Sequence, residues 1–161
     1  MTGKISSYFF VIFLFIASSV FGQETFTHPD AGVSITLPAG WYYEIEGDDM
    51  NAYSEDNAVA MSFSVLHASD IDAALEEVDK MIDSLFENIS LGEAESFDLN
   101  GMNTIFLEGQ ADGLEIAFEL IETPISGVSL FLSAWGTADA VEKYSSDIEL
   151  IFGSISPSSN E

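Results

Sequence analysis

The sequence predicts an α+β fold, in which a mostly antiparallel β-sheet is flanked by two amphipathic helices in the order β-β-β-α-β-β-β-β-α. Several segments alternate apolar and polar residues with a period of two, which is typical of half-buried strands. Two longer segments repeat apolar residues at helical spacing. Asn100-Gly101 and Asp112-Gly113 are dipeptides that favour the two-residue type I′ turns of antiparallel hairpins.

Three strands are expected before the first helix. Residues 33–37 alternate apolar and polar side chains, and Pro38 and Gly40 end that strand. Residues 41–46 form a second strand, with acidic side chains on its polar side. Residues 59–65 alternate in the same way and form the third.

The first helix is predicted near residues 70–89, opened by Ser69 as its cap. Its apolar positions recur at steps of three and four and define one buried face: Ile71, Leu75, Val78, Ile82, Leu85 and Ile89. The opposite face is largely acidic and is expected to be solvated.

A run of about four strands follows Gly92, including residues 102–110, 114–120 and 128–135. A second helix is predicted at 138–152, capped by Thr137, with its apolar face turned inward. Within it, Asp139 and Lys143 are spaced for a favourable ion pair. Residues 156–161 are expected to form a frayed tail.

The first 22 residues have the layout of a secretory signal peptide. Lys4 lies in a short positive region, residues 8–17 are apolar, and Val20 and Gly22 occupy the −3 and −1 positions of a cleavage site. An uncleaved anchor is the alternative, but the apolar segment is shorter than the roughly 20 residues that span a bilayer. Removing 22 of the 161 residues leaves 139, which are expected to form a single domain (23–161) in the periplasm or medium. With no cysteine, the chain is not a lipoprotein and has no disulfide.

The composition is strongly acidic, with 28 Asp and Glu against 3 Lys and Arg and a net charge of −25. Once Lys4 is removed, the basic residues are Lys80 and Lys143. Nucleic acids, phosphorylated ligands and anionic membrane surfaces are bound mainly through lysine and arginine. These three classes of partner are therefore excluded for the mature protein.

Two explanations for the acidity remain open. Dispersed carboxylates keep a protein hydrated in high salt, whereas clustered ones bind calcium. The acids are spread along the chain, which favours salt adaptation. Weak calcium candidates are Asp48, Asp49, Glu55 and Asp56, in a segment that lacks the spacing of an EF-hand loop.

No motif for catalysis is found. The chain has no cysteine, no Gly-x-Ser-x-Gly elbow and only two histidines, His28 and His67, too few for a typical zinc site. No catalytic residue, metal ligand or cofactor is therefore predicted. Hydrolysis by a pair of carboxylates remains an alternative, because the two residues of such a pair come together in the folded protein and need not be close in the sequence.

The chain resembles the PsbP-like superfamily in its LPAGW segment (37–41), its Asn100-Gly101 hairpin and its C-terminal DIELIFGSI segment (147–155). That superfamily includes the PsbP protein of photosystem II, a Ran-binding import factor and DcrB-like bacterial envelope proteins. The resemblance implies an exported bacterial member that acts as a non-enzymatic binding or accessory module, with a protein partner in the envelope or medium. It also implies that LPAGW is structural, with the Trp41 ring packed against a helix. The alternatives are a small carboxylate-dependent hydrolase and a calcium-binding envelope protein.

Overall fold

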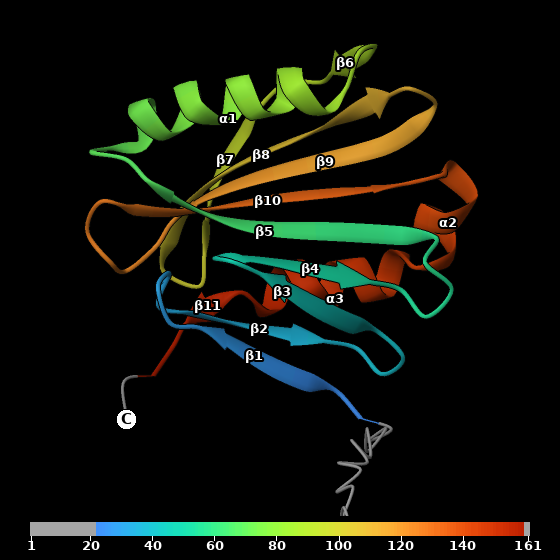
Figure 1. Cartoon of the computed structure of the whole chain (residues 1–161), viewed down its shortest axis with the longest axis horizontal. Helices are drawn as coiled ribbons and strands as arrows, with labels where there is room; N and C mark the ends of the chain where they lie inside the picture. Colours follow the sequence, from blue (N-terminus) through green and yellow to red (C-terminus); the bar gives the residue numbers. More distant parts are fainter. Residues whose placement is uncertain (1–21, 160–161) are drawn as a thin grey trace, which may run out of the picture.

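An eight-stranded antiparallel sheet crosses the centre of the computed structural model, which describes residues 22–159 (Figure 1). Along the sheet the strands are β3 (Tyr42–Glu46), β4 (Asp49–Tyr53), β5 (Val59–His67), β10 (Val128–Gly136), β9 (Leu114–Glu122) and β8 (Met102–Ala111), after which β6 (Ile89–Leu91) and β7 (Glu95–Leu99) both pair with β8. A smaller sheet joins β1 (Glu24–His28), β2 (Val33–Leu37) and β11 (Ser156–Pro157).

Helices cover both faces of the large sheet, which confirms the predicted α+β class. Helix α1 (Ile71–Leu85) lies on one face, and α2 (Ala138–Lys143) and α3 (Ser145–Ser154) lie on the other, together with the small sheet (Figure 1). The result is three layers, with the large sheet in the middle.

The first helix is shorter than predicted. Its N-cap is Asp70 rather than Ser69, and the Asp70 side chain accepts a hydrogen bond from Ala73 N at 2.9 Å. The helix ends at Leu85, because Ile89 pairs with Ala111 as part of β6. Leu85 is consequently 53% exposed rather than part of the buried face.

Other differences from the predicted order arise from pairing over long distances. Strands β1 and β4 are additional to the three strands predicted before the first helix, and five strands (β6–β10) rather than about four lie between α1 and α2. The strand at 33–37 belongs to the small sheet instead of the large one. The second predicted helix is two helices, divided at Tyr144. Residues 156–157, expected to be frayed, pair with β2.

Both predicted hairpins are confirmed. Asn100 and Gly101 have φ values of 52° and 88°, and Asp112 and Gly113 have values of 52° and 83°, as type I′ turns require. Asn100 has a second role, because its Nδ2 donates to the carbonyl oxygens of Gly153 (3.1 Å) and Ile155 (2.7 Å) at the end of α3. The hairpin thereby fixes the position of that helix.

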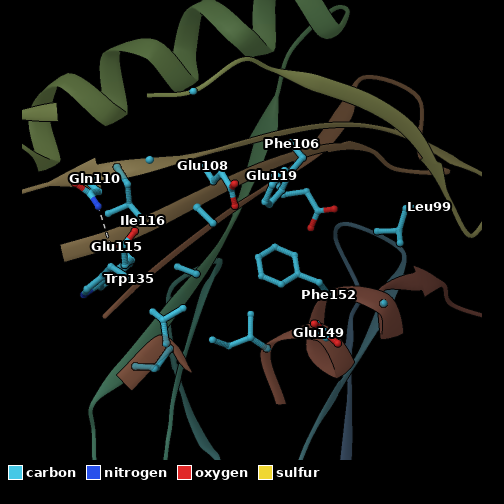
Figure 2. Close-up of a pocket in the computed structure, with 18 of the residues that line it drawn as sticks. Leu99, Phe106, Glu108, Gln110, Glu115, Ile116, Glu119, Trp135, Glu149 and Phe152 are labelled. Atoms are coloured by element: carbon cyan, nitrogen blue, oxygen red, sulfur yellow. Dashed lines mark hydrogen bonds between the residues drawn. The ribbon is translucent and has the colours of Figure 1, made fainter. Parts of the chain in front are cut away.

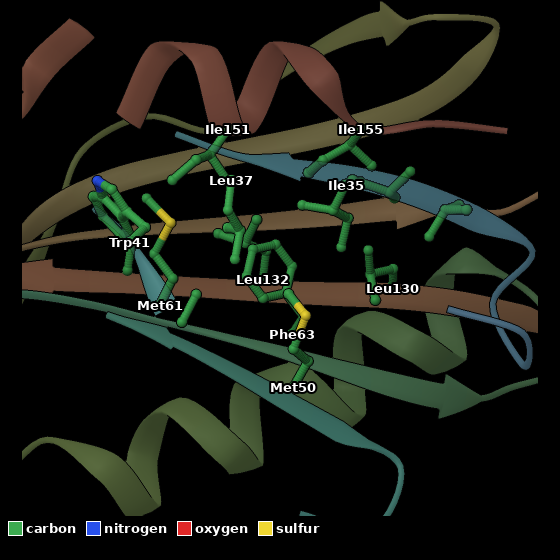
Figure 3. Close-up of a cluster of buried hydrophobic side chains, with 14 of the residues drawn as sticks. Ile35, Leu37, Trp41, Met50, Met61, Phe63, Leu130, Leu132, Ile151 and Ile155 are labelled. Atoms are coloured by element: carbon green, nitrogen blue, oxygen red, sulfur yellow. The ribbon is translucent and has the colours of Figure 1, made fainter. Parts of the chain in front are cut away.

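Two apolar clusters form the core, one on each face of the large sheet. The cluster under α1 includes Val78, Ile82 and Phe118. The larger cluster lies between the large sheet and the layer of α3 and the small sheet, where Phe63, Leu132 and Ile151 are each fully buried (Figure 3). Both faces of the central strands are therefore buried.

Trp41 anchors α3 to the start of β3, as the structural interpretation of LPAGW predicts. Its ring is 8% exposed and meets the Tyr144 ring edge to face at 5.9 Å between centroids. Its Nε1–H donates to Asp147 Oδ2 at 2.9 Å. The tryptophan thus makes both an apolar and a charge-assisted contact with the C-terminal helices.

We expect Trp41→Phe to lower the free energy of unfolding by about 1–3 kcal/mol, because it removes a hydrogen bond to a charged acceptor and part of a buried ring. Urea unfolding of Trp41→Phe, Asp147→Ala and the double variant measures the coupling between the two side chains. Strictly additive losses would show that the hydrogen bond contributes nothing.

The predicted signal peptide falls on residues that lie outside the described part of the chain, apart from Gly22. Within residues 22–159, none of the helices combines the length and apolar character needed to cross a bilayer.

Candidate functional site

A pocket of about 790 Å³ lies between α3 and the half of the large sheet formed by β8, β9 and β10 (Figure 2). The sheet contributes Phe106 and Glu119, and α3 contributes Ile148, Glu149 and Phe152. Further lining residues come from β7, the other strands and α2: Phe97, Leu99, Glu108, Gln110, Glu115, Ala117, Ala134 and Val141. Figure 2 shows the Phe152 ring extending from α3 toward the strands that carry Glu108 and Glu119.

The pocket exists because small residues face α3 at this end of the sheet. Ala117 on β9 pairs directly with Ala134 on β10, so two short side chains lie side by side on the wall of the pocket. Phe152 fills part of the space and meets Phe106 edge to face, with 6.1 Å between ring centroids. The remaining volume is lined mainly by apolar groups.

Glu119 is the most unusual side chain in the pocket. It lies between Phe106 on β8 and Leu132 on β10 and is 1% exposed. Its Oε2 atom has no hydrogen-bond partner among the described residues. Buried polar atoms are nearly always paired in folded proteins, so the unpaired carboxyl oxygen makes Glu119 a candidate site residue of this pocket.

Burial raises the pKa of Glu119 to about 8, because the charged carboxylate is poorly solvated there. At neutral pH the side chain is therefore mainly the neutral acid, which can donate one hydrogen bond and accept others. A carboxyl group with such a pKa inside a pocket is typical of binding and catalytic sites.

The sequence pattern alone does not identify Glu119. Alternation assigns it to the solvated face of its strand, together with Glu115 and Ala117. One signal points the other way: Leu120 and Ile121 are consecutive apolar residues, which break the alternation and indicate a strand buried on both faces. The second predicted helix (138–152) is a further signal, because its apolar face must pack against an apolar surface elsewhere in the protein.

The four calcium candidates are divided between two turns. Asp48 and Asp49 lie at the β3–β4 hairpin, whereas Glu55 and Asp56 lie in the turn between β4 and β5. Strand β4 separates these turns by its whole length, so the structure does not bring the four side chains together. Asp56 instead pairs with Lys143 at 2.7 Å, and this contact lowers the pKa of the Asp56 carboxyl.

The two histidines lie outside the pocket lining. His28 is 4% exposed, and its Nε2–H donates to the Asp48 carbonyl at 2.8 Å, which ties β1 to the β3–β4 turn. His67 is the exposed last residue of β5. Neither contributes to the pocket that contains Glu119.

We expect salt to stabilise the protein smoothly and without preference for a cation, because screening relieves the repulsion among its carboxylates. Thermal melts in sodium chloride and calcium chloride at matched ionic strength measure this. A saturable calcium effect that disappears in Asp48→Asn/Asp49→Asn would instead establish a calcium site.

Comparison with solved structures identifies the fold. The cyanobacterial PsbP protein of Synechocystis matches with a TM-score of 0.64 and 12% identity, over 86% of this chain and 94% of that one. LpqN of Mycobacterium tuberculosis, described as involved in cell envelope biogenesis, matches with a TM-score of 0.60 and 14% identity, over 83% and 89%. The Ran-binding protein Mog1p of Saccharomyces cerevisiae matches with a TM-score of 0.55 and 8% identity, over 84% and 95%.

The chain therefore has the PsbP-like fold, and the resemblance seen in the sequence is confirmed at the level of the fold. No protein-family model matches the sequence. No curated protein matches it either.

Proposed function

We propose that the protein is an exported, non-enzymatic binding module whose ligand places an apolar group in the pocket between α3 and strands β8–β10. The observation that carries this proposal is the pocket itself, about 790 Å³ in volume and lined mainly by apolar side chains. Protein sites for small ligands are concave, mostly apolar and supplied with a few polar groups, and Glu119 is such a group here. The Ran-binding role of Mog1p and the involvement of LpqN in envelope biogenesis agree with a binding or accessory role.

A neutral fluorescent probe, N-phenyl-1-naphthylamine, tests the pocket. The mature protein is expected to bind it, whereas Ala117→Phe is expected to abolish binding by filling the space beside Ala134. Ala39→Phe is the matched control, because Ala39 is exposed and does not line the pocket. Equal binding by both variants, each shown to be folded by circular dichroism, would contradict the proposed site.

One observation favours a second candidate, a carboxylate-dependent hydrolase. Glu119 has the raised pKa of a general acid, and Glu108 and Glu149 line the same pocket as potential partners. A panel of p-nitrophenyl glycosides and esters separates the candidates. Turnover that is lost in Glu119→Gln would support the hydrolase, and the absence of turnover by a protein that binds the probe would support the binding module.

Export is expected to remove residues 1–22, so that the mature chain begins at Gln23. Mass spectrometry of the protein from the periplasm or the medium measures this directly. Intact Met1 in a membrane fraction would contradict it. A Gly22→Arg variant, which places a large charged residue at the −1 position, is expected to remain unprocessed.

A further inference from the structure

The titratable side chains that line the pocket are all acids. Four carboxyl groups line it, Glu108 on β8, Glu115 and Glu119 on β9, and Glu149 on α3, and its lining among the described residues contains no lysine or arginine. Of the two lysines in the described part of the chain, Lys143 pairs with Asp56, and Lys80 is on α1, on the other face of the sheet. A ligand that carries negative charge would be repelled from this site.

The buried carboxyl of Glu119 lacks a partner at Oε2 within residues 22–159, and this is the polar atom that a bound ligand would satisfy. Two aromatic rings lie near the Glu119 side chain, because Phe106 is the residue paired with Glu119 on β8 and Phe152 packs against Phe106. Aromatic faces and a carboxylate together attract organic cations, through the ring quadrupole and direct charge pairing. A bare metal ion fits less well, since no group of three or more acidic or histidine side chains in the described part of the chain is arranged to hold one.

We propose that the pocket binds an organic amine, with the apolar body of the ligand among Phe106, Ile148 and Phe152 and its ammonium group at the Glu119 carboxylate. This inference rests on the proposed binding function and specifies the class of ligand. The amine supplies N–H donors for the unpaired Oε2 atom and a positive charge for a negatively charged site.

Binding of this kind is coupled to a proton. Burial keeps Glu119 protonated in the free protein below about pH 8, and pairing with an ammonium ion requires the ionised form. The ligand therefore displaces the proton, and its affinity should rise roughly tenfold per pH unit up to pH 8 and then level off. The other titratable groups that face the site, Glu108, Glu115 and Glu149, are all acids and strengthen the attraction for the cation.

Three probes of one chain length test the inference: decylamine, decan-1-ol and decanoate, each used below its aggregation concentration. Displacement of N-phenyl-1-naphthylamine gives the affinities between pH 6 and 9. Calorimetry in phosphate and Tris buffers at pH 7 gives the number of protons released. We expect decylamine to bind at least about tenfold more tightly than decanol at pH 8, with decanoate weakest, and to release about 0.9 proton at pH 7.

Glu119→Gln keeps the size of the side chain but cannot ionise. It is expected to retain decanol binding within about twofold while losing the preference for decylamine, the proton release and the pH dependence. Glu77→Gln on the exposed surface of α1 makes the same change of net charge and should behave as the unmodified protein. This control separates pairing at Glu119 from general attraction of cations to an acidic protein.

The outcomes distinguish this inference from the proposed function. Equal affinity for decanol and decylamine, or amine binding without proton release, would overturn the amine inference and leave an apolar binding pocket. If decylamine binds to Ala117→Phe as tightly as to the unmodified protein, its binding site lies on the surface rather than in the pocket. That result would also overturn the inference. If neither decanol, decylamine nor the fluorescent probe binds, both the inference and the proposed function are wrong.

Discussion

Replacing Glu119 with glutamine is expected to make the protein more stable than the unmodified form at pH 8–9, while the two forms should have similar stability near pH 5. The folded-state pKa of Glu119, about 8, lies above its ordinary value of 4.5, so the native state holds a proton that the unfolded chain releases. The contribution of Glu119 to the free energy of unfolding is therefore fully present below pH 4.5 and is lost as the pH rises through about 8.

The difference between the folded and unfolded pKa values sets the size of the effect. It is on the order of 4 kcal/mol between pH 5 and pH 9, because a tenfold change in the acid dissociation constant corresponds to about 1.4 kcal/mol. Urea unfolding at pH 5, 6.5, 8 and 9 measures it, with Glu77→Gln as the control for net charge. Hydrogen bonds lower the pKa values of Asp70 and Asp112 below their ordinary value of 3.8, so these groups stay ionised across this range. Parallel pH profiles for Glu119→Gln and the unmodified protein would show that Glu119 is solvated or paired in solution.

Replacing Ile82 with aspartate is expected to unfold the protein at room temperature or to lower its free energy of unfolding by more than about 4 kcal/mol. Ile82 is 5% exposed and belongs to the apolar cluster between α1 and the large sheet. The substitution removes a buried side chain and introduces a charge with no partner. Circular dichroism during thermal unfolding measures the loss.

Two controls come from the same helix. Leu75→Asp should cost less than Ile82→Asp, because Leu75 is only partly buried against the cluster. Leu85→Asp should lower the free energy of unfolding by no more than about 1.5 kcal/mol, because Leu85 is 53% exposed and the remaining cost is that of a carboxylate at the C-terminus of the helix. Equal effects at positions 82 and 85 would contradict the observed end of the helix and support the longer one that the periodicity predicts.

The local chemistry of the sequence is enough to predict the turns and most regular elements. Asn-Gly and Asp-Gly tolerate positive φ at both turn positions, so the hairpins at residues 100–101 and 112–113 are encoded by the dipeptides themselves. The amphipathic faces of the helices and the alternation of β5, β9 and β10 are equally local, since they depend on spacing alone. These features are sufficient to predict the α+β class, whereas the resemblance to the PsbP-like superfamily depends on the LPAGW, Asn100-Gly101 and DIELIFGSI segments.

Tertiary structure decides which strand lies beside which and what covers each face. Strand β4 falls in an acidic, turn-like segment and becomes a strand because it pairs with both β3 and β5. Spacing predicts that Lys143 pairs with Asp139 four residues away, but it pairs with Asp56, which lies 87 positions away in the sequence. Glu119 occupies a position that alternation assigns to solvent, and it is buried because α3 covers the second face of the sheet. Spacing along a strand specifies that two faces exist, whereas only the packing of distant segments determines whether the second face meets water.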